Sequence, residues 1–233
     1  MSRIHPTFNC NRTKELFGEG HRSGPSVFTV WKRSSMSFQG TDGFTVFDEY
    51  GGLAFRVDNY SRKIGGCLGD GLVLMDGTGD ALLTLAPKVL SMQRVWNAYG
   101  GDCTGGGRSR AFRQFSVREP WKFPILAGLK SKCQGGAEPE VKAEVFIGDA
   151  RWPEYSVEGS FRRRSCCIRR RSTGDVIAKI SRKSARANPR VMLEDEVFSL
   201  VVQPGLDNGL IMGLIVILDR ICSGPVSPFM CCC

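Results

Sequence analysis

The fold of this chain is decided by residues 206–222, which read LDNGLIMGLIVILDRIC. A helix over residues 210–218 has no polar side, because every residue there is apolar or glycine. A bilayer span needs ~20 apolar residues, and Asp219 and Arg220 end this run too early. A helix that is apolar all round must be wrapped by protein instead, and Asp207 is placed to cap its N-terminus. We therefore predict a helix buried inside a closed β-structure.

The chain before this stretch is typical of short β-strands. Apolar and polar residues alternate with a period of two, and turn residues separate the runs. The clearest hairpins join residues 44–47 to 53–57 and residues 72–75 to 81–85. Further strands are expected over residues 92–99, 112–117, 141–147, 155–161, 165–169, 176–180 and 197–202, with long loops over residues 100–109 and 130–139. The predicted fold class is mainly β, a β-barrel with a central helix.

A chain of 233 residues with 42% hydrophobic residues is long enough for one sizeable core. We expect a flexible tail over residues 1–25, one barrel domain over residues 26–222 and a second flexible tail over residues 223–233. The first tail lacks the apolar stretch of a signal peptide, which favours a cytoplasmic or nuclear protein that is not secreted. Ten cysteines without a Cys-x-x-Cys pair fit neither a disulfide framework nor a zinc site, so most are expected to be reduced.

One short pattern occurs twice in the sequence. Thr78-Gly79-Asp80, with the strand that follows it, resembles Thr173-Gly174-Asp175 and its own following strand, ninety-five positions later. Gly-Asp turns are common in hairpins, so one coincidental match is one interpretation. The alternative is a barrel built from two similar halves.

Several blocks, taken in order, resemble the plant LURP-one-related family. They are the hairpin over residues 44–57, the strand block over residues 76–85, residues 88–92 with Trp96, the strand at residues 159–161 and the helix over residues 212–221. The resemblance runs from about Ser26 to Cys222. It implies a fold similar to the tubby C-terminal domain and the phospholipid scramblases, a twelve-stranded closed barrel around a C-terminal hydrophobic helix. It also implies a link to plant defence, without an established biochemical activity.

Charge is the sharpest functional signal in the sequence. Residues 151–190 hold twelve basic and three acidic side chains, a net charge of +9 that equals the charge of the whole chain. Such a region attracts phosphates, whether in lipid head groups or in nucleic acid. A solvated basic rim is the alternative interpretation. The expected phosphate-binding residues are Arg162, Arg164, Arg169, Arg171 and Lys179.

Catalytic constellations are nearly absent from the sequence. The two histidines, His5 and His21, fall in the predicted first tail, which argues against Ser-His, Cys-His and most zinc chemistry. Adjacent Cys166 and Cys167 point to opposite faces if they lie on a strand, so they do not jointly bind a metal. We expect no catalytic residue, no metal and no cofactor. Aromatic residues in the basic region, Trp152, Tyr155 and Phe161, suit either base stacking or a barrel core.

The chain ends in three cysteines, Cys231, Cys232 and Cys233, after a short Gly-Pro-Ser segment. These thiols are candidates for lipidation, although no Cys-a-a-X box is present. A lipid chain beside a basic patch supplies the two signals that stable membrane anchoring needs. The alternative is that these cysteines have no function.

Together these features favour a non-enzymatic adaptor that binds phosphoinositides or anionic phospholipid head groups, peripherally at the plasma membrane. We expect a monomer, acting in plant defence or stress signalling. The main rival is a nucleic-acid-binding or membrane-tethered transcription regulator that uses the same basic surface. A carrier for a hydrophobic ligand is disfavoured, because the central helix occupies the space that a ligand needs.

Overall fold

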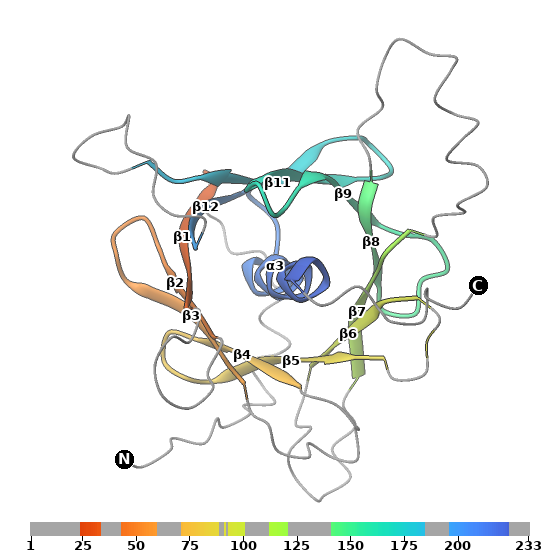
Figure 1. The fold of residues 1–233 in the computed structure, drawn as a ribbon, viewed down its shortest axis with the longest axis horizontal. Coiled ribbons are helices and arrows are strands. Elements are labelled where there is room, and N and C mark those ends of the chain that lie inside the picture. Colours follow the sequence, from red (N-terminus) through yellow and green to blue (C-terminus); the bar gives the residue numbers. More distant parts are fainter. Residues whose placement is uncertain are drawn as a thin grey trace, which may run out of the picture.

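The computed structural model describes residues 24–33, 43–59, 71–88, 91, 93–100, 112–120, 141–184 and 196–223. Within these residues, twelve antiparallel strands close into one barrel around a helix (Figure 1). The strands are β1 (Ser26–Arg33), β2 (Gly43–Phe47), β3 (Leu53–Asn59), β4 (Leu72–Asp76), β5 (Ala81–Pro87), β6 (Val95–Gly100), β7 (Phe112–Arg118), β8 (Val141–Ile147), β9 (Tyr155–Ser160), β10 (Ser165–Arg170), β11 (Val176–Arg182) and β12 (Val197–Val202), and the helix is α3 (Asn208–Ser223).

The barrel has an up-and-down topology, in which each strand pairs with its neighbours in the chain. The pairing of β1 with β12 closes it, in a register that runs from Ser26 opposite Val202 to Trp31 opposite Val197. Closure leaves no unpaired strand edge in the sheet, so every strand has a partner on both sides. The molecule therefore offers strand faces, turns and barrel ends for binding.

Helix α3 lies inside the barrel, as the sequence predicts (Figure 1). Leu214, Ile215 and Val216 have no solvent exposure. Asp207 caps the helix, because its Oδ1 accepts hydrogen bonds from the backbone N–H groups of Gly209 (2.7 Å) and Leu210 (3.2 Å). No helix in the described part of the chain is long and apolar enough to cross a membrane.

A glycine lets the helix approach one strand closely. A Cβ atom on Gly213 would come within 2.9 Å of Leu83 Cδ1 and 3.2 Å of Phe115 Cζ. A larger residue at position 213 would therefore require Leu83 and Phe115 to shift or α3 to move outward. The close approach favours a glycine in an otherwise apolar run.

The structure confirms eleven of the predicted strands, with small shifts at their ends, and adds β1. Strand β1 was missed, although Phe28 and Val30 alternate inward and are buried. Its run of regular alternation ends early, at the exposed Trp31 and the basic residues that follow. Residues 1–23, 101–111, 121–140 and 224–233 lie outside the described residues, and with them most of the predicted tails and long loops.

The pattern that occurs twice in the sequence corresponds to two hairpins at equivalent positions. Hairpins β4–β5 and β10–β11 lie six strands apart in a barrel of twelve. The first makes three regular pairs before a β-bulge and the second makes four, and the bulges follow Leu74 in the first hairpin and Ile168 in the second. The glycines of the two turns, Gly79 and Gly174, both have positive φ. The hairpins occupy opposite positions in the barrel, but hairpin β2–β3 also makes three regular pairs before a β-bulge, and Gly51 in its turn also has positive φ. Register and bulge therefore do not distinguish two similar halves from a coincidental match.

Candidate anion-binding surface

The wall formed by β9, β10 and β11 carries a row of polar residues on its outer face. Cys167 of β10 pairs with Glu158 of β9 on one side and with Lys179 of β11 on the other. Directly paired residues point to the same face of a sheet, so these three side chains form one row across the wall. Their neighbours Cys166 and Ile180 are buried and point into the barrel.

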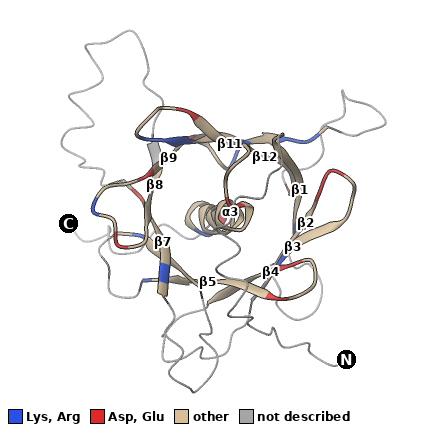
Figure 2. Cartoon of the chain, turned by 180° about the vertical axis from the view of Figure 1, so that it is seen from behind, with Lys and Arg blue, Asp and Glu red and all other residues tan. Residues whose placement is uncertain are grey.

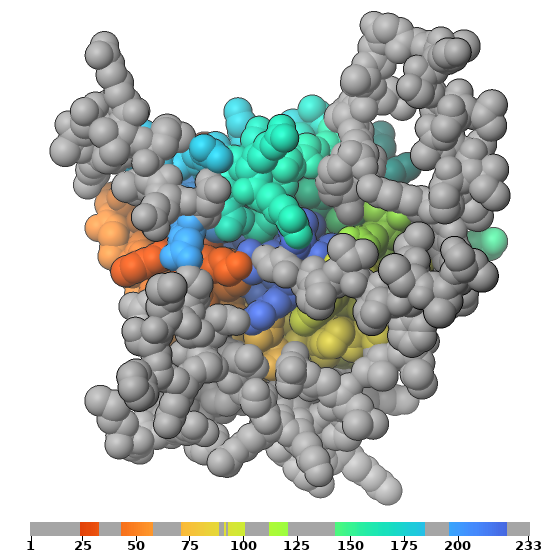
Figure 3. All heavy atoms as spheres, viewed as in Figure 1, coloured from red at the N-terminus to blue at the C-terminus, as the bar shows by residue number. Residues whose placement is uncertain are grey.

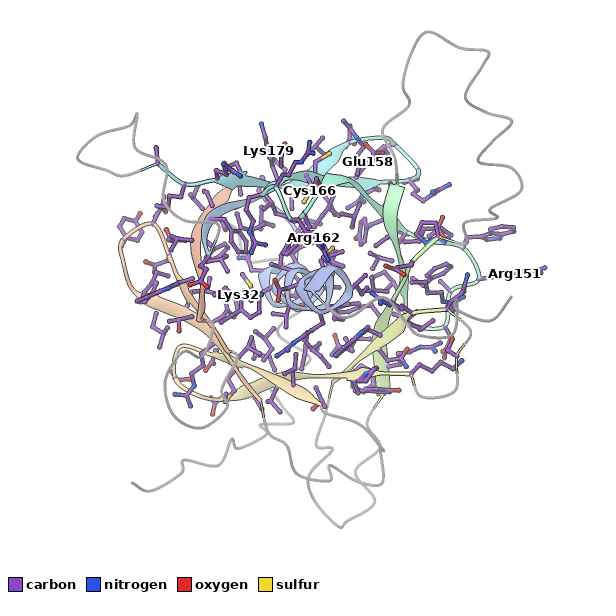
Figure 4. All side chains as sticks on the ribbon, viewed as in Figure 1. Lys32, Arg151, Glu158, Arg162, Cys166 and Lys179 are labelled. Atoms are coloured by element: carbon purple, nitrogen blue, oxygen red, sulfur yellow. The ribbon has the colours of Figure 1, made fainter. Side chains whose placement is uncertain are left out.

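An open depression of about 780 Å³ lies along this wall. Four cationic side chains line it outside the core, from Arg163, Arg169, Lys179 and Arg182, against one acidic side chain, Glu158. We call this feature the basic depression. Basic segments mark the same wall in Figure 2, and its atoms form one continuous surface above the helix in Figure 3. In Figure 4, Lys179 and Glu158 lie on the outer side of the wall.

Arg169 is held in place by two contacts. Its Nε donates a hydrogen bond to Glu158 Oε2 (2.7 Å), and its Nη1 donates one to the carbonyl oxygen of Gly174 in the β10–β11 turn (2.9 Å). The bond to Glu158 also raises the pKa of Arg169, so the side chain remains a cation. Arg169 therefore connects the basic depression to the turn formed by residues 171–175.

Arg163 and Arg182 approach each other at the other end of the depression. Arg182 Nε lies 3.3 Å from the carbonyl oxygen of Arg163 and donates a hydrogen bond to it. Both residues are exposed, as is Lys179. A phosphate group entering from solvent can therefore reach cations at both ends and in the middle of the depression.

Arg162, one of the expected phosphate-binding residues, does not line the depression. Its Nε donates a hydrogen bond to the carbonyl oxygen of Cys222 (2.7 Å), in the last turn of α3. Arg94 Nη1 binds the preceding carbonyl, that of Ile221, at 2.8 Å. Cations are favoured at helix C-termini, where carbonyl groups lack partners within the helix. Figure 4 shows Arg162 next to the helix, and its role here is to cap α3.

Arg164 is buried and 7% exposed, although it lies in the β9–β10 turn. Its guanidinium stacks over the rings of Phe161 and Phe198, and its Nη2 lies 3.9 Å from Asp219 Oδ1. Lys32 Nζ contacts the same carboxylate at 3.1 Å. Asp219 of α3 is therefore compensated by cations from β1 and from the turn. Arg164 belongs to the core and is not accessible to a phosphate in solvent.

Arg171, the remaining expected residue, lies at the edge of the surface. Its side chain is 46% exposed, and its Nη1 lies 3.5 Å from Glu144 Oε1. Lys183, also in the basic region, donates a hydrogen bond to Thr29 Oγ1 of β1 at 2.6 Å. Of the five expected residues, Arg169 and Lys179 are brought together in the depression, and the buried Arg164 lines it from the core side. Arg171 lies nearby, whereas Arg162 caps α3.

The described cysteines are free thiols, and burial suppresses the reactivity of two of them. Burial raises the pKa of Cys166 to about 12, and it also raises the pKa of Cys222. A thiol with so high a pKa stays protonated at neutral pH and is a poor nucleophile. In the described part of the chain, no group of three or more His, Cys, Asp or Glu residues is arranged to hold a metal.

The aromatic residues of the basic region mostly serve the core. Tyr155 is 9% exposed and Phe161 is 4% exposed, so neither offers a face for base stacking. Trp152, in the β8–β9 turn, is 75% exposed, with Arg151 beside its ring. One exposed ring at a turn does not form a platform along the depression.

Sequence reasoning missed Arg163 and Arg182. For three consecutive arginines on a strand, alternation places Arg162 and Arg164 on one face and Arg163 on the other. Nothing in the sequence showed which face is outside, and the structure replaces the strand here with a turn in which Arg164 has a φ of 50°. Alternation along β11 places Arg182 on the same face as the buried Ile180 and opposite to Lys179, so no local pattern indicated that Arg182 would be exposed at the end of the strand. Cys231, Cys232 and Cys233 lie outside the described residues.

Fold and surface define a closed antiparallel barrel, filled by its own C-terminal helix, with a basic outer wall. The sequence profile of the LURP-one-related family matches residues 26–219, and the chain belongs to this family. Protein LURP-one-related 5 of Arabidopsis thaliana is 39% identical over 82% of this chain and 80% of its own length. Protein LURP-one-related 8 of the same plant is 31% identical over 94% and 97%.

A solved structure has the same fold. The crystal structure of an Arabidopsis thaliana protein matches with a TM-score of 0.54 and 22% sequence identity, over 84% of this chain and 91% of that one. At this identity the likeness concerns the fold alone. The two relatives are similar to this chain over most of their length.

Proposed function

We propose that this protein is a non-enzymatic adaptor that binds anionic phospholipid head groups, such as phosphoinositides, at a membrane surface. The observation that carries the proposal is the basic depression, where four cations face one carboxylate on the outside of the barrel. As its setting we propose plant defence or stress signalling, which rests on the family resemblance alone.

The physical basis of the proposal is electrostatic. Each Lys or Arg close to an anionic membrane contributes about 1 kcal/mol to binding, and the contribution falls off within a Debye length of ~8 Å at physiological salt. Arg163, Lys179 and Arg182 are exposed and can approach phosphates directly. Binding should therefore be measurable at low ionic strength and should weaken steeply as salt is added.

The test is vesicle flotation with the full chain. Phosphatidylcholine vesicles with and without phosphatidylinositol 4,5-bisphosphate are compared at low salt, for the natural protein and for Lys179→Gln. Loss of one cation from the depression should weaken binding about fivefold. Lys88→Gln is the matched control, because Lys88 is also an exposed lysine but lies after β5, outside the depression. Lys88→Gln should weaken vesicle binding by less than about twofold.

Two results would overturn the proposal. One is natural protein that ignores anionic vesicles at low salt, which leaves the basic wall as a solvated rim. The other is an equal loss for Lys179→Gln and Lys88→Gln, which would mean that only net charge matters. Salt-titrated binding to single-stranded and duplex nucleic acid runs in parallel. Tight binding there, without vesicle binding, would favour the nucleic-acid-binding regulator.

We also propose that at least one of Cys231, Cys232 and Cys233 carries a lipid in cells. One acyl chain alone gives marginal, reversible membrane binding, so its effect should depend on the basic depression as a second signal. Changing all three cysteines to Ser should move the protein from membrane to soluble fractions and leave thermal unfolding unchanged. Intact-mass analysis of protein from its native cells detects the lipid, and three unmodified thiols would end this proposal.

A further inference from the structure

The sequence Arg-Arg-Arg-Ser occurs twice in the basic wall, at residues 162–165 and at residues 169–172. Arginines two and three residues before a serine are a charge pattern that one class of Ser/Thr protein kinases selects in its substrates. The two copies are identical as sequence, so only their structural contexts distinguish them.

The first copy is locked into the fold. Arg162 binds the carbonyl oxygen of Cys222 in the last turn of α3, and Arg164 is 7% exposed beside Asp219. Ser165 itself begins β10 and pairs with strands on both sides, opposite Ser160 and Ser181. Arg162, Arg163 and Ser165 are exposed, but a kinase that needs the segment free in its cleft would have to open the pairing of β10 on both sides and withdraw Arg164 from Asp219.

The second copy is presented outward. Ser172 lies in the turn of residues 171–175, where every residue is exposed. The turn is closed by two backbone hydrogen bonds, from Arg170 to Asp175 (2.9 Å) and from Gly174 to Arg170 (2.8 Å), and a third, from Arg171 to Glu154 (2.9 Å), ties it to the β8–β9 connection. Opening these bonds and the Arg169–Gly174 contact frees the serine without unpairing a strand core, and such exposed turns belong to the least stable parts of a fold.

Ser172 is also the better acceptor within its own turn. The neighbouring Thr173 Oγ1 accepts a hydrogen bond from the backbone N–H of Asp175 (3.3 Å) and so helps to hold the turn. Among the described residues, the Ser172 hydroxyl makes no such hydrogen bond. The structure therefore distinguishes Ser172 from Thr173 as the acceptor of a phosphate, which the sequence alone does not.

We propose that Ser172 is a phosphorylation site for an arginine-directed Ser/Thr kinase, and that its phosphate weakens anion binding by the basic depression. The regulatory half of this inference rests on the proposed function. In the modification, Ser172 Oγ attacks the γ-phosphorus of ATP, the new bond is Oγ–P, and the bond from that phosphorus to the bridging oxygen breaks. ADP leaves, and the hydroxyl proton passes to the kinase's base.

The phosphate acts on the depression through Arg169. A phosphoserine adds ≈ −1.5 to −2 charge and three acceptor oxygens. Arg169 already reaches this turn through its hydrogen bond to the Gly174 carbonyl, and Arg170 and Arg171 precede the serine directly. A phosphate at position 172 offers these arginines a covalently attached partner, in competition with a lipid phosphate. Vesicle binding should weaken about tenfold or more at low salt.

The experiment begins with the folded full chain, magnesium, ATP and the catalytic subunit of the cyclic-AMP-dependent protein kinase as the probe. Peptide mass spectrometry locates the phosphate in the natural protein, in Ser172→Ala and in Ser165→Ala. Two synthetic peptides, one for each Arg-Arg-Arg-Ser copy, serve as unfolded references. We expect both peptides to be modified, the folded protein to be modified at Ser172, and only Ser172→Ala to abolish this.

Flotation then compares phosphorylated and unmodified protein on the phosphoinositide vesicles, with kinase-treated Ser172→Ala as control. Modification of Ser165 or Thr173 in preference to Ser172 overturns the acceptor assignment, as does a folded protein that is not modified. Unchanged flotation of the phosphorylated protein overturns the regulatory half alone. If unmodified protein never floats, the proposed function fails together with the regulatory half, while the mass spectra still decide the acceptor.

Discussion

At the scale of single residues, one aspartate shows how a turn is fixed. Asp76 Oδ1 accepts hydrogen bonds from the backbone N–H groups of Thr78, Gly79 and Asp80 and from the Thr78 hydroxyl, at 2.6–3.0 Å. Burial acts to raise the pKa of Asp76, but these hydrogen bonds outweigh it and the pKa is lowered from its usual 3.8. The charged carboxylate is thus the form that holds the β4–β5 turn.

The stability contributed by Asp76 should depend on pH in one direction. Because its pKa is lower in the folded state, the contribution is fully present above the unfolded pKa and is lost as pH falls through the folded pKa. Asp76→Ala should therefore cost about 1 kcal/mol at neutral pH and progressively less below pH ~3.8. Urea unfolding at neutral pH and at a pH below ~3.8 measures this change in the free energy of unfolding. Asp48→Ala, which removes an acceptor of two backbone N–H groups in the β2–β3 turn, is the control and should cost less. A cost for Asp76→Ala that is independent of pH would contradict the prediction.

A second residue-scale prediction concerns Asp219, which is 4% exposed. Asp219→Leu removes the carboxylate from buried Arg164 and from Lys32, and breaking a buried pair by removing one partner costs about 3–5 kcal/mol. The double change Asp219→Leu with Arg164→Met should recover much of that loss, because it removes the uncompensated guanidinium. Thermal and denaturant unfolding of both variants decide this. A double variant as unstable as the single one would show that the ion pair is not the reason for the loss.

At the scale of elements, α3 stabilises the barrel by filling it. Ile215 has no exposed surface and lies in the middle of the helix. Ile215→Asp places a charge without a partner in the core and should unfold the domain. Ile215→Leu, which conserves volume, should cost less than about 1.5 kcal/mol. Circular dichroism during thermal unfolding tests both, and a cooperatively folding Ile215→Asp protein would refute the role of the helix as core.

The sequence predicted the secondary-structure elements better than the side-chain contacts around them. The helix was recognised because residues 210–218 are apolar throughout, yet α3 continues to Ser223, since cations from other elements compensate Asp219 and cap the last carbonyls. Such long-range partners leave no local pattern. For the same reason the sequence identified the basic region and its members Arg169 and Lys179, but not that Arg162 caps α3 and Arg164 is buried while Arg163 lines the depression.

At the scale of the whole molecule, hairpins β4–β5 and β10–β11 have similar backbones but different surfaces. The outward positions that hold Cys167 and Arg169 in hairpin β10–β11 hold Val73 and Met75 in hairpin β4–β5, and these two are buried. Both hairpins have a β-bulge before the turn, so the backbone does not determine where the cations gather. The side chains on equivalent positions do, and in the part of the chain described the basic depression lies along β9, β10 and β11.

The position of α3 has a consequence for how the chain acquires its fold. The helix follows all twelve strands, and closure joins β1 to β12 across almost the full described length. Contacts so distant in sequence make folding slow, because loop-closure entropy is lost before they form. Until the helix docks, the inward faces of the strands lack the core that α3 supplies. Folding should thus be a single late, concerted event, and before it the nascent barrel is a natural client for chaperones.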